Sequence, residues 1–487
     1  MNIAFVKPPI GGILGLEMLT FVEPLGPISI AGGLETDGHT VRIFDLRLDG
    51  EEPGMAACRA FEPRIVGLQC NFTTERNRTL RLAARIRREI PDAFIVIGGH
   101  DASREPEWFL HPSIDAIAIG DGEEVMPVLV DALEHVGKHG GELAKVPGLL
   151  LNTPDGPVST GEAMMRKDLD SLPLPARHLI AHYAPHYYIN FRKPLALMET
   201  ARGCPFKCNF CSVWKFHDST FRVKSPERVV AELQQIEAPN VFITDDIFWM
   251  DVRRGEEMAR QIKAAGIRKY FTVQTRTDII CKFPHLVEMW KDCGDLSIFL
   301  GLESVTDEGL DAVNKSNTAA NNVRALNILR DLGVGYTPNF IVDPAWDRED
   351  FARLRAWIEE TGAYNSGFSI LTPLPGTDLW ETAKREVTTH DWEMYDIVHT
   401  VLPTRLSLEE FYAEYSRLWR HVLDVRYRHR GKMRTYVALG AALATGKVSL
   451  GAVRKGMNIA KVFSKPETFL RAHRAPTPPE PESARLS

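Results

Sequence analysis

Three closely spaced cysteines are the residues of this sequence with the most distinctive chemistry. Cys204, Cys208 and Cys211 follow the apolar stretch 195–199 at C-x3-C-x2-C spacing. Three thiolates on one short loop can hold three irons of a four-iron cluster. No fourth cysteine follows nearby, so the fourth iron would keep an open position where a small molecule could bind and be reduced. The spacing therefore predicts a [4Fe-4S] cluster with an open corner.

Zinc and a disulfide are the alternative uses of these cysteines. A zinc site normally closes with a fourth Cys or His, and His217 is near enough in sequence to serve. The seven cysteines are an odd number, and the chain shows no secretory signal, so we expect a reducing interior without disulfides. The remaining cysteines are expected to pack in cores: Cys58, Cys70, Cys281 and Cys293.

Length and composition are those of an ordinary globular protein. The length favours about three domains. A content of 44% hydrophobic and 25% charged residues allows sizeable cores. The net charge of −6 gives no general attraction to nucleic acid, so we expect no nucleic-acid partner. No apolar run is long enough to span a bilayer, and we expect a cytoplasmic protein.

The N-terminal third alternates short apolar strands with helices. The expected strands are 3–6, 41–46, 65–69, 94–97 and 116–119, and the expected helices are 27–37, 74–90 and 123–135. Such alternation is typical of a doubly wound parallel sheet. The loops 98–100 and 120–124 at strand ends contain glycines, which allow a ligand to approach the backbone closely.

A second alternating pattern begins near residue 194. The expected strands are 195–199, 241–244, 271–275, 297–302, 337–342 and 368–372, with helices between them such as 225–236 and 251–265. Six strand–helix units suit a partial parallel barrel, whose active loops lie at the C-terminal ends of its strands. The cysteine loop follows the first of these strands, so the element pattern places it where chemistry is expected.

The C-terminal region has a different composition. A helix is expected over 406–427, and residues 425–465 contain no Asp or Glu. This stretch carries ten basic residues and the mostly apolar run 436–445. It suits either an anionic membrane surface or an ordinary helical cap with solvated charges. The final residues are too polar and proline-rich to fold.

We therefore expect an α/β chain with five parts. These are a Rossmann-like domain (1–140), an irregular linker punctuated by prolines (141–190), a partial (β/α)6 barrel (191–390), a helical C-terminal domain (391–472) and a disordered tail (473–487).

The cysteine loop and the barrel pattern together resemble radical S-adenosylmethionine (SAM) enzymes. The resemblance implies that an external donor supplies an electron to the cluster, which cleaves SAM into methionine and a 5′-deoxyadenosyl radical. That radical takes hydrogen from an unactivated carbon. The cofactors carry this chemistry, so no side chain is assigned a catalytic role.

Polar residues end the second, third and fourth barrel strands, where such enzymes bind SAM. Asp245 and Asp246 resemble groups that face the SAM amino group, and a carboxylate could satisfy an ammonium there. The alternative for them is a helix N-cap. The other candidate SAM-binding residues are Gln274, Arg276, Glu303 and Ser304.

The N-terminal domain resembles the cobalamin-binding domain of the same superfamily. The matching residues are Gly98, Gly99, His100 and Ser103 in one loop, and Gly120, Gly122, Glu123 and Glu124 in another. A flavodoxin-like or nucleotide-binding domain is the alternative. The D-x-H-x-x-G motif that supplies histidine to cobalt is absent, because Arg42 occupies the glycine position after Asp37 and His39. We therefore expect no cobalt ligand from that motif.

The complete layout resembles cobalamin-dependent radical SAM methyltransferases, most of all the hopanoid A-ring methylases. This implies that methylcobalamin donates a methyl group to a hydrophobic, lipid-like substrate and that a second SAM remethylates cobalt. It also implies an external electron donor and allows peripheral membrane contact. Alternatives are a radical cyclase or oxidase, a tetrapyrrole methylase of the bacteriochlorophyll pathway, and a non-catalytic cobalamin-binding sensor.

Overall fold

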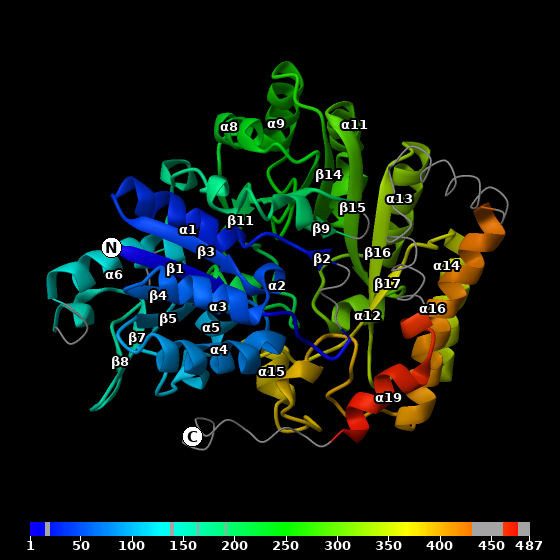
Figure 1. Ribbon diagram of the computed structural model, residues 1–487. Helices are drawn as coiled ribbons and strands as arrows, with labels where there is room; N and C mark the ends of the chain where they lie inside the picture. The colour runs from blue at the N-terminus through cyan, green and yellow to red at the C-terminus, as the bar shows by residue number, and fades with distance from the viewer. Residues whose placement is uncertain (15–19, 137–140, 163–164, 190–191, 431–460, 476–487) are drawn as a thin grey trace.

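The computed structural model describes residues 1–14, 20–136, 141–162, 165–189, 192–430 and 461–475 (Figure 1). Two sheets account for most of its strands, with seven strands in the first and six in the second. In Figure 1 the first sheet lies on the left, and the second lies to its right, with the C-terminal helices beyond it. The expected α/β fold class is confirmed.

The first sheet has the order β3-β1-β4-β5-β6-β7-β8. Its parallel strands are β1 (Asn2–Lys7), β3 (Thr40–Asp45), β4 (Ile65–Gln69), β5 (Phe94–Gly98) and β6 (Ala116–Ala118). They are rich in Ile and Val because helices cover both faces of the sheet. One core forms with α1 (Leu25–Thr36) and α6 (Gly122–Val136), and the other forms with α3 (Glu51–Ala60), α4 (Arg76–Glu89) and α5 (His100–Arg104).

Two antiparallel strands extend this sheet beyond residue 140. They are β7 (Leu149–Thr153) and β8 (Gly156–Ser159), which pair as a hairpin beside β6. This hairpin lies within the stretch 141–190 that was expected to be an irregular linker, and its turn Thr153-Pro154-Asp155-Gly156 is a strong hairpin signal. The domain boundaries themselves stay predictions.

The second sheet is a half-barrel of six parallel strands. Its order is β10 (Leu195–Met198), β13 (Asn240–Ile243), β14 (Lys269–Thr275), β15 (Gly294–Glu303), β16 (Gly335–Val342) and β17 (Gly367–Ile370). Helices α8 (Pro226–Gln235), α9 (Val252–Ala264), α11 (Pro284–Asp292), α13 (Ala319–Asp331) and α14 (Arg348–Thr361) connect successive strands. On β15 the alternating burial places Leu296, Ile298 and Leu300 in the core. Strands β10 and β17 are the two edges.

Shorter elements complete the described chain. They are the helices α2 (Leu46–Asp49), α7 (Val213–Phe216), α10 (Thr277–Lys282), α12 (Asp307–Ala312) and α15 (Asp378–Ala383), with the strand pairs β2 (Thr20–Phe21) with β9 (Tyr188–Ile189) and β11 (Ala201–Arg202) with β12 (Arg222–Val223).

Two C-terminal helices pack against the outside of the half-barrel. Helix α16 (Leu408–Arg430) lies along α14, and α19 (Pro466–Arg474) packs on α16, where the rings of Tyr412 and Phe469 stack with centroids 5.1 Å apart (Figure 1). Most of the expected basic stretch, including the apolar run 436–445, lies outside the described residues, as does 476–487 of the expected disordered tail. Within the part of the chain that the structure describes, no helix is long and apolar enough to cross a membrane.

The helix-covered face of the half-barrel should dominate the stability of this domain. Trp290 is fully buried beside Phe271, and its indole N–H donates to the Gly255 carbonyl at 3.0 Å. We expect Trp290→Ala to lower the free energy of unfolding by about 3–5 kcal/mol, because it opens a large cavity and removes the hydrogen bond to that carbonyl. Denaturant unfolding should show this loss, whereas Phe299→Ala, at a site 39% exposed on β15, should change it far less. Equal losses in the two variants would contradict this assignment of the core.

Candidate functional site

A cavity of about 1020 Å³ lies between the two sheets and is lined by residues of both. In the first sheet it lies at the carboxyl ends of β1, β4, β5 and β6, and in the half-barrel it reaches β10, β13 and β14. Strand order reverses between β1 and β4, because β3 lies on one side of β1 and the later strands on the other. Ligands of doubly wound sheets bind at such a switch point.

The cysteine loop follows β10 and β11 at the carboxyl end of the half-barrel. Cys208 is buried, and Cys204 and Cys211 are half-buried. Burial raises the pKa of all three thiols, that of Cys211 to about 12, so a bound metal would have to favour their ionised form. Over the described residues, no three Cys, His, Asp or Glu side chains are grouped to hold a single metal ion. A three-thiol set on one loop is nevertheless the donor chemistry that iron–sulfur clusters use.

Two adjacent aspartates hold the backbone that leads into this loop. The buried Asp245 carboxylate accepts hydrogen bonds from the Thr200 amide at 2.6 Å, the Thr200 hydroxyl at 2.5 Å and the Ala201 amide at 3.0 Å. The Asp246 carboxylate accepts one from the Gly203 amide at 2.9 Å. Asp246 also lines the cavity, whereas Asp245 does not. The two neighbours therefore have different surroundings.

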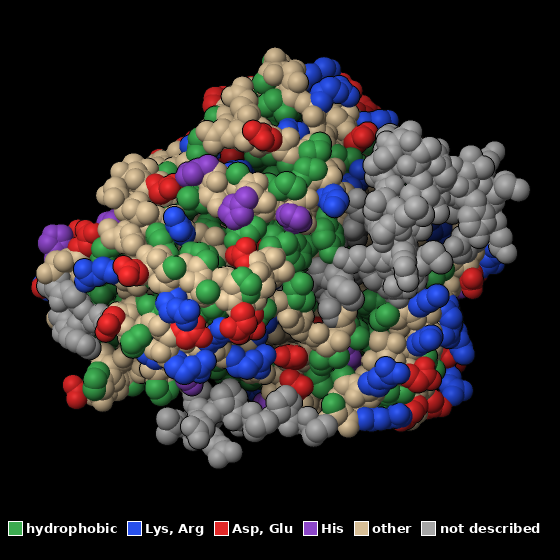
Figure 2. All heavy atoms as spheres, in the orientation of Figure 1, with side chains coloured by type: hydrophobic (Ala, Val, Ile, Leu, Met, Phe, Trp, Pro, Cys, Tyr) green, Lys and Arg blue, Asp and Glu red, His purple; other side chains and the backbone are tan. Residues whose placement is uncertain are grey.

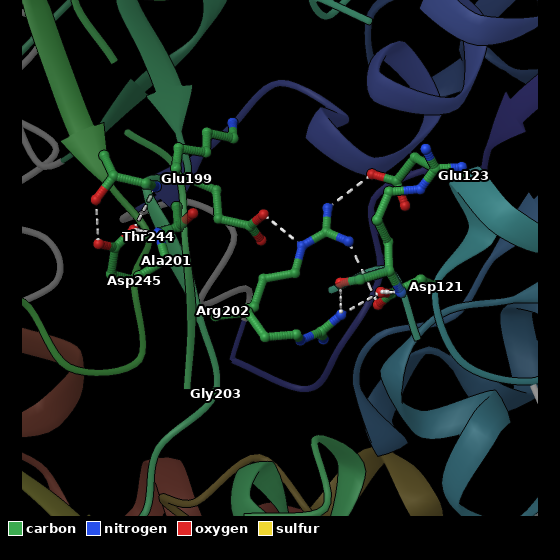
Figure 3. Close-up of polar contacts among 12 residues, drawn as sticks. Asp121, Glu123, Glu199, Ala201, Arg202, Gly203, Thr244 and Asp245 are labelled. Atoms are coloured by element: carbon green, nitrogen blue, oxygen red, sulfur yellow. Dashed lines mark hydrogen bonds and ion pairs between the residues drawn. The ribbon is translucent and has the colours of Figure 1, made fainter. Parts of the chain in front are cut away.

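Arg202, which precedes the first cysteine by two residues, joins the two sheets electrostatically. Its guanidinium lies 2.6 Å from Glu199 in its own domain, and 2.7 Å from Glu123 and 3.3 Å from Asp121 in the N-terminal domain (Figure 3). Arg222 also pairs with Asp121, at 2.6 Å. Although burial favours the neutral acid, Arg202 and Arg222 hold the pKa of Asp121 below its usual value.

His217 connects this charge network to Asp246. Arg222 donates to Nδ1 of His217 at 2.9 Å, so the ring proton sits on Nε2, which lies 3.9 Å from the Asp246 carboxylate. Burial and the neighbouring Arg222 lower the pKa of His217 to about 4, and burial raises that of Asp246 to about 7. No Lys or Arg of the described chain forms an ion pair with Asp246. A cationic ligand group would therefore find a carboxylate without a fixed countercharge.

The remaining barrel candidates occupy two different places. Gln274 lines the cavity and donates to the Asp245 carbonyl at 2.8 Å. Arg276 lies outside the cavity lining, stacked on the ring of Phe206 from the cysteine loop with 3.7 Å from guanidinium carbon to ring centroid.

Glu303 and Ser304 also lie outside the cavity lining. The Glu303 carboxylate pairs with Lys315 at 2.7 Å, and the Ser304 hydroxyl caps the Thr306 amide at 3.1 Å. Burial raises the pKa of the Cys208 thiol, and the nearby cations Lys315 and Arg276 oppose that rise.

The candidates in the N-terminal domain mostly meet at the cavity. Its lining includes Gly98, Gly99, His100, Gly120, Gly122 and Glu123. Ser103 and Glu124 lie behind it: the Ser103 hydroxyl accepts from the Gly120 amide at 3.2 Å, and Glu124 pairs with Arg166.

Two features of the β5 loop bear on a cobalamin cofactor. Gly99 has φ +112°, and a Cβ there would lie 2.6 Å from the Cys70 carbonyl oxygen, so only glycine fits this wall of the cavity. The imidazole Nε2 of His100 lies 2.6 Å from the hydroxyl of Ser212, the residue after Cys211, and its ring packs on Phe216. The glycine loops fit a ligand held close to the backbone. His100 links this domain to the half-barrel, because it contacts the residue that directly follows the last cysteine.

Sequence reasoning missed several residues of this site. Four of them belong to no recognisable motif: Thr200, Ser212, Arg222 and Lys315. Asp121 was given no role, although it lies between two glycines that were assigned to the cofactor. Arg202 directly precedes the Gly203-Cys204 pair, which was its only local signal. Their roles come from contacts between segments far apart in the chain.

Comparison with protein families agrees with this geometry. The model described as "B12 binding domain" matches residues 11–130, and the model of the radical SAM superfamily matches residues 198–358. These ranges contain the glycine loops and the cysteine loop respectively. The two domains imply a [4Fe-4S] cluster, SAM and cobalamin as cofactors.

Two relatives and one solved structure extend the comparison. The hopanoid C-3 methylase of Methylococcus capsulatus is 32% identical over 96% of this chain and 89% of its own. The anaerobic magnesium-protoporphyrin IX monomethyl ester cyclase of Rubrivivax gelatinosus is 28% identical over 82% of this chain and 73% of its own. The cobalamin-dependent SAM radical enzyme OxsB, solved with aqua-cobalamin and SAM bound, shares the fold at TM-score 0.67 and 15% identity, over 100% of this chain and 82% of its own. Similarity at this level over nearly the whole chain shows that the protein belongs to the B12-binding radical SAM methyltransferase family.

Proposed function

We propose that this enzyme methylates an unactivated carbon of a hydrophobic substrate, a polycyclic lipid of the hopanoid type. The observation that carries the proposal is that both domains line one cavity. The N-terminal domain contributes its glycine loops, and the half-barrel contributes the strand ends where SAM is proposed to bind. When bound, SAM and its cluster would supply the hydrogen-abstracting radical, and cobalamin would supply the methyl group. An external electron donor would complete the system.

The protein's own residues would bind, orient and shield these groups. Cys204, Cys208 and Cys211 are the proposed cluster ligands. Asp246 is the proposed partner of the SAM ammonium, since it faces the cavity and has no Lys or Arg paired with it among the described residues. Asp245 would act indirectly, because its oxygens already accept three hydrogen bonds from Thr200 and Ala201.

The cavity entrance supports an apolar substrate. Three large hydrophobic side chains both line the cavity and reach solvent: Ile13 is 36% exposed, Phe72 67% and Ile397 43%. They come from three separate loops, in the N-terminal domain and in the region that follows β17. Water-exposed apolar groups at a cavity mouth are typical of sites that admit apolar ligands. Within this class, the similarity to the M. capsulatus relative supports a hopanoid-type lipid.

Peripheral membrane contact is a weaker part of the proposal. Figure 2 shows Lys and Arg side chains gathered over α16 and α19, mixed with Asp and Glu. Several of these charges are paired, for example Arg428 with Glu359 and Arg348 with Glu410. Within the basic stretch, Arg428 therefore has a partner on the protein itself, and support for membrane contact comes mainly from the apolar side chains that line the cavity.

A tetrapyrrole substrate is the second candidate, favoured by the similarity to the R. gelatinosus cyclase. A methyltransferase adds one methylene unit to the product mass, whereas a cyclase or oxidase removes hydrogen or adds oxygen. The mass change therefore separates methyl transfer from cyclisation or oxidation, and the identity of the changed compound separates a lipid from a tetrapyrrole substrate.

The cluster assignment can be tested with a matched pair of cysteine variants. After anaerobic reconstitution the protein should hold about four irons, and Cys208→Ala should lose them together with SAM cleavage. Cys281→Ala, which removes a buried thiol elsewhere in the barrel, should keep both. Iron analysis and detection of 5′-deoxyadenosine make the comparison, and retained SAM cleavage in Cys208→Ala would refute the assignment.

The two aspartates should differ in effect. Asp246→Asn should weaken SAM binding about 10- to 100-fold while iron content stays unchanged, because it removes one charged partner of the ligand. Asp245→Ala should instead reduce iron content and lower the melting temperature, because the Thr200–Ala201 backbone loses its acceptor. Equilibrium SAM binding and iron analysis of both variants test this, and the opposite pattern would reverse the assignments.

The substrate class is tested by lipid profiling of a host with and without the gene. We expect a polycyclic lipid heavier by one methylene unit only when the intact gene is present. The gene carrying Cys208→Ala serves as the control, since that variant lacks a proposed cluster ligand. A change confined to tetrapyrroles would favour the second candidate instead.

A further inference from the structure

One cation on the cavity wall differs from all the others that the structure describes there. The described lining contains six Lys and Arg residues, and five of them have a carboxylate within 4 Å. The pairs are Lys7–Glu75 (2.7 Å), Arg47–Asp45 (2.6 Å), Arg78–Glu75 (3.4 Å), Arg202–Glu199 (2.6 Å) and Lys224–Glu232 (2.9 Å). The sixth, Arg104, makes no ion pair within the described chain.

The contacts of Arg104 leave its charge uncompensated. One terminal nitrogen donates to the Gly376 carbonyl at 3.2 Å, and Nε is buried without a hydrogen-bond partner among the described residues. The adjacent Glu105 carboxylate is directed to Arg76, at 2.9 Å. Burial lowers the pKa of the Arg104 guanidinium, yet arginine remains protonated in proteins. The half-buried guanidinium therefore lies against the cavity with one hydrogen bond to a carbonyl and with no carboxylate at ion-pair distance among the described residues.

Such an arrangement would be stabilised by a ligand that supplies the countercharge. A charge moved from water into a protein interior needs a partner, and the other five lining cations all have one. The guanidinium presents a planar fork of N–H donors that matches carboxylate and phosphate oxygens. The missing partner is thus expected to be an anionic group of a molecule bound in the cavity.

The location of Arg104 indicates which molecule that is. Arg104 ends α5, which begins at His100 directly after the glycine loop of β5, so it belongs to the B12-binding domain. The second domain limits its movement, because a Cβ at Gly376 would come within 2.7 Å of the Arg104 Nε. The guanidinium is therefore packed in place at the seam between the two domains.

We propose that Arg104 binds the phosphodiester of the cobalamin nucleotide tail. The phosphodiester is the one anionic group among the amide side chains and neutral base of that cofactor. The inference rests on cobalamin as a cofactor and is independent of the substrate class. Arg104 would thus select complete cobalamin over corrinoids that lack the nucleotide.

Cobinamide provides the test, because it keeps the corrin ring but lacks the nucleotide and its phosphodiester. Full-length protein would be titrated with hydroxocobalamin and, separately, with cobinamide, and binding followed by calorimetry or corrin absorbance. Arg104→Gln should weaken cobalamin binding about 10- to 100-fold, the loss expected for a charged hydrogen-bonding partner. Its affinity for cobinamide should stay within about twofold of the unmodified protein, a difference below 0.5 kcal/mol.

Two further variants control the comparison. Arg104→Lys keeps the charge but loses the fork, so it should retain part of the preference for cobalamin. Arg88→Gln removes an exposed cation of the same domain, far from the cavity lining, and should change neither affinity. Cobinamide binding reports correct folding of each variant, and Arg104→Lys carries the test if Arg104→Gln does not fold. Equal losses for both corrinoids, no loss for either, or a loss confined to substrate binding would overturn the proposal.

Discussion

The structure depends on a buried set of charges that holds two separately built sheets at a fixed separation. Arg202 lies beside the cysteine loop, yet two of its three carboxylate partners, Asp121 and Glu123, come from the other domain. If one of these acids were removed while the domains stayed docked, the guanidinium would remain buried without that partner. Breaking one buried pair of this kind costs roughly 3–5 kcal/mol. These pairs therefore fix how the two domains of the chain dock against one another.

Further contacts around the cavity also hold the two domains against one another. The imidazole of His100 meets the hydroxyl of Ser212, so a glycine loop of one domain touches the cysteine loop of the other. On another side, the fully buried Arg76 lies against the rings of Trp108 and Trp392, which belong to different parts of the chain. Chemistry that passes between two cofactors needs them within reach of a single substrate. These contacts explain how two domains can meet that requirement.

Local sequence patterns predicted most of the fold and the elements of the site. All six half-barrel strands lie within three residues of their expected bounds, because buried parallel strands are short apolar runs between polar helices. The hairpin β7–β8 was missed, since its turn signal stands in a proline-rich stretch. Among the assigned acids, Asp245 and Asp246 look equivalent in sequence. Only one of them lines the cavity.

The sequence alone determined the chemistry and the fold class: thiolate spacing depends on neighbouring residues, and strand and helix periodicity is local. Only the tertiary structure decided which charges are compensated. Glu123, assigned to the cofactor and part of the cavity lining, also pairs with Arg202, from a segment 79 positions away. Arg104 resembles any surface arginine in sequence and proves to have no carboxylate partner within the described residues. The physical reason is that the interaction between two charged side chains depends on their distance in space and on their burial. Neither follows from the order of residues along the chain.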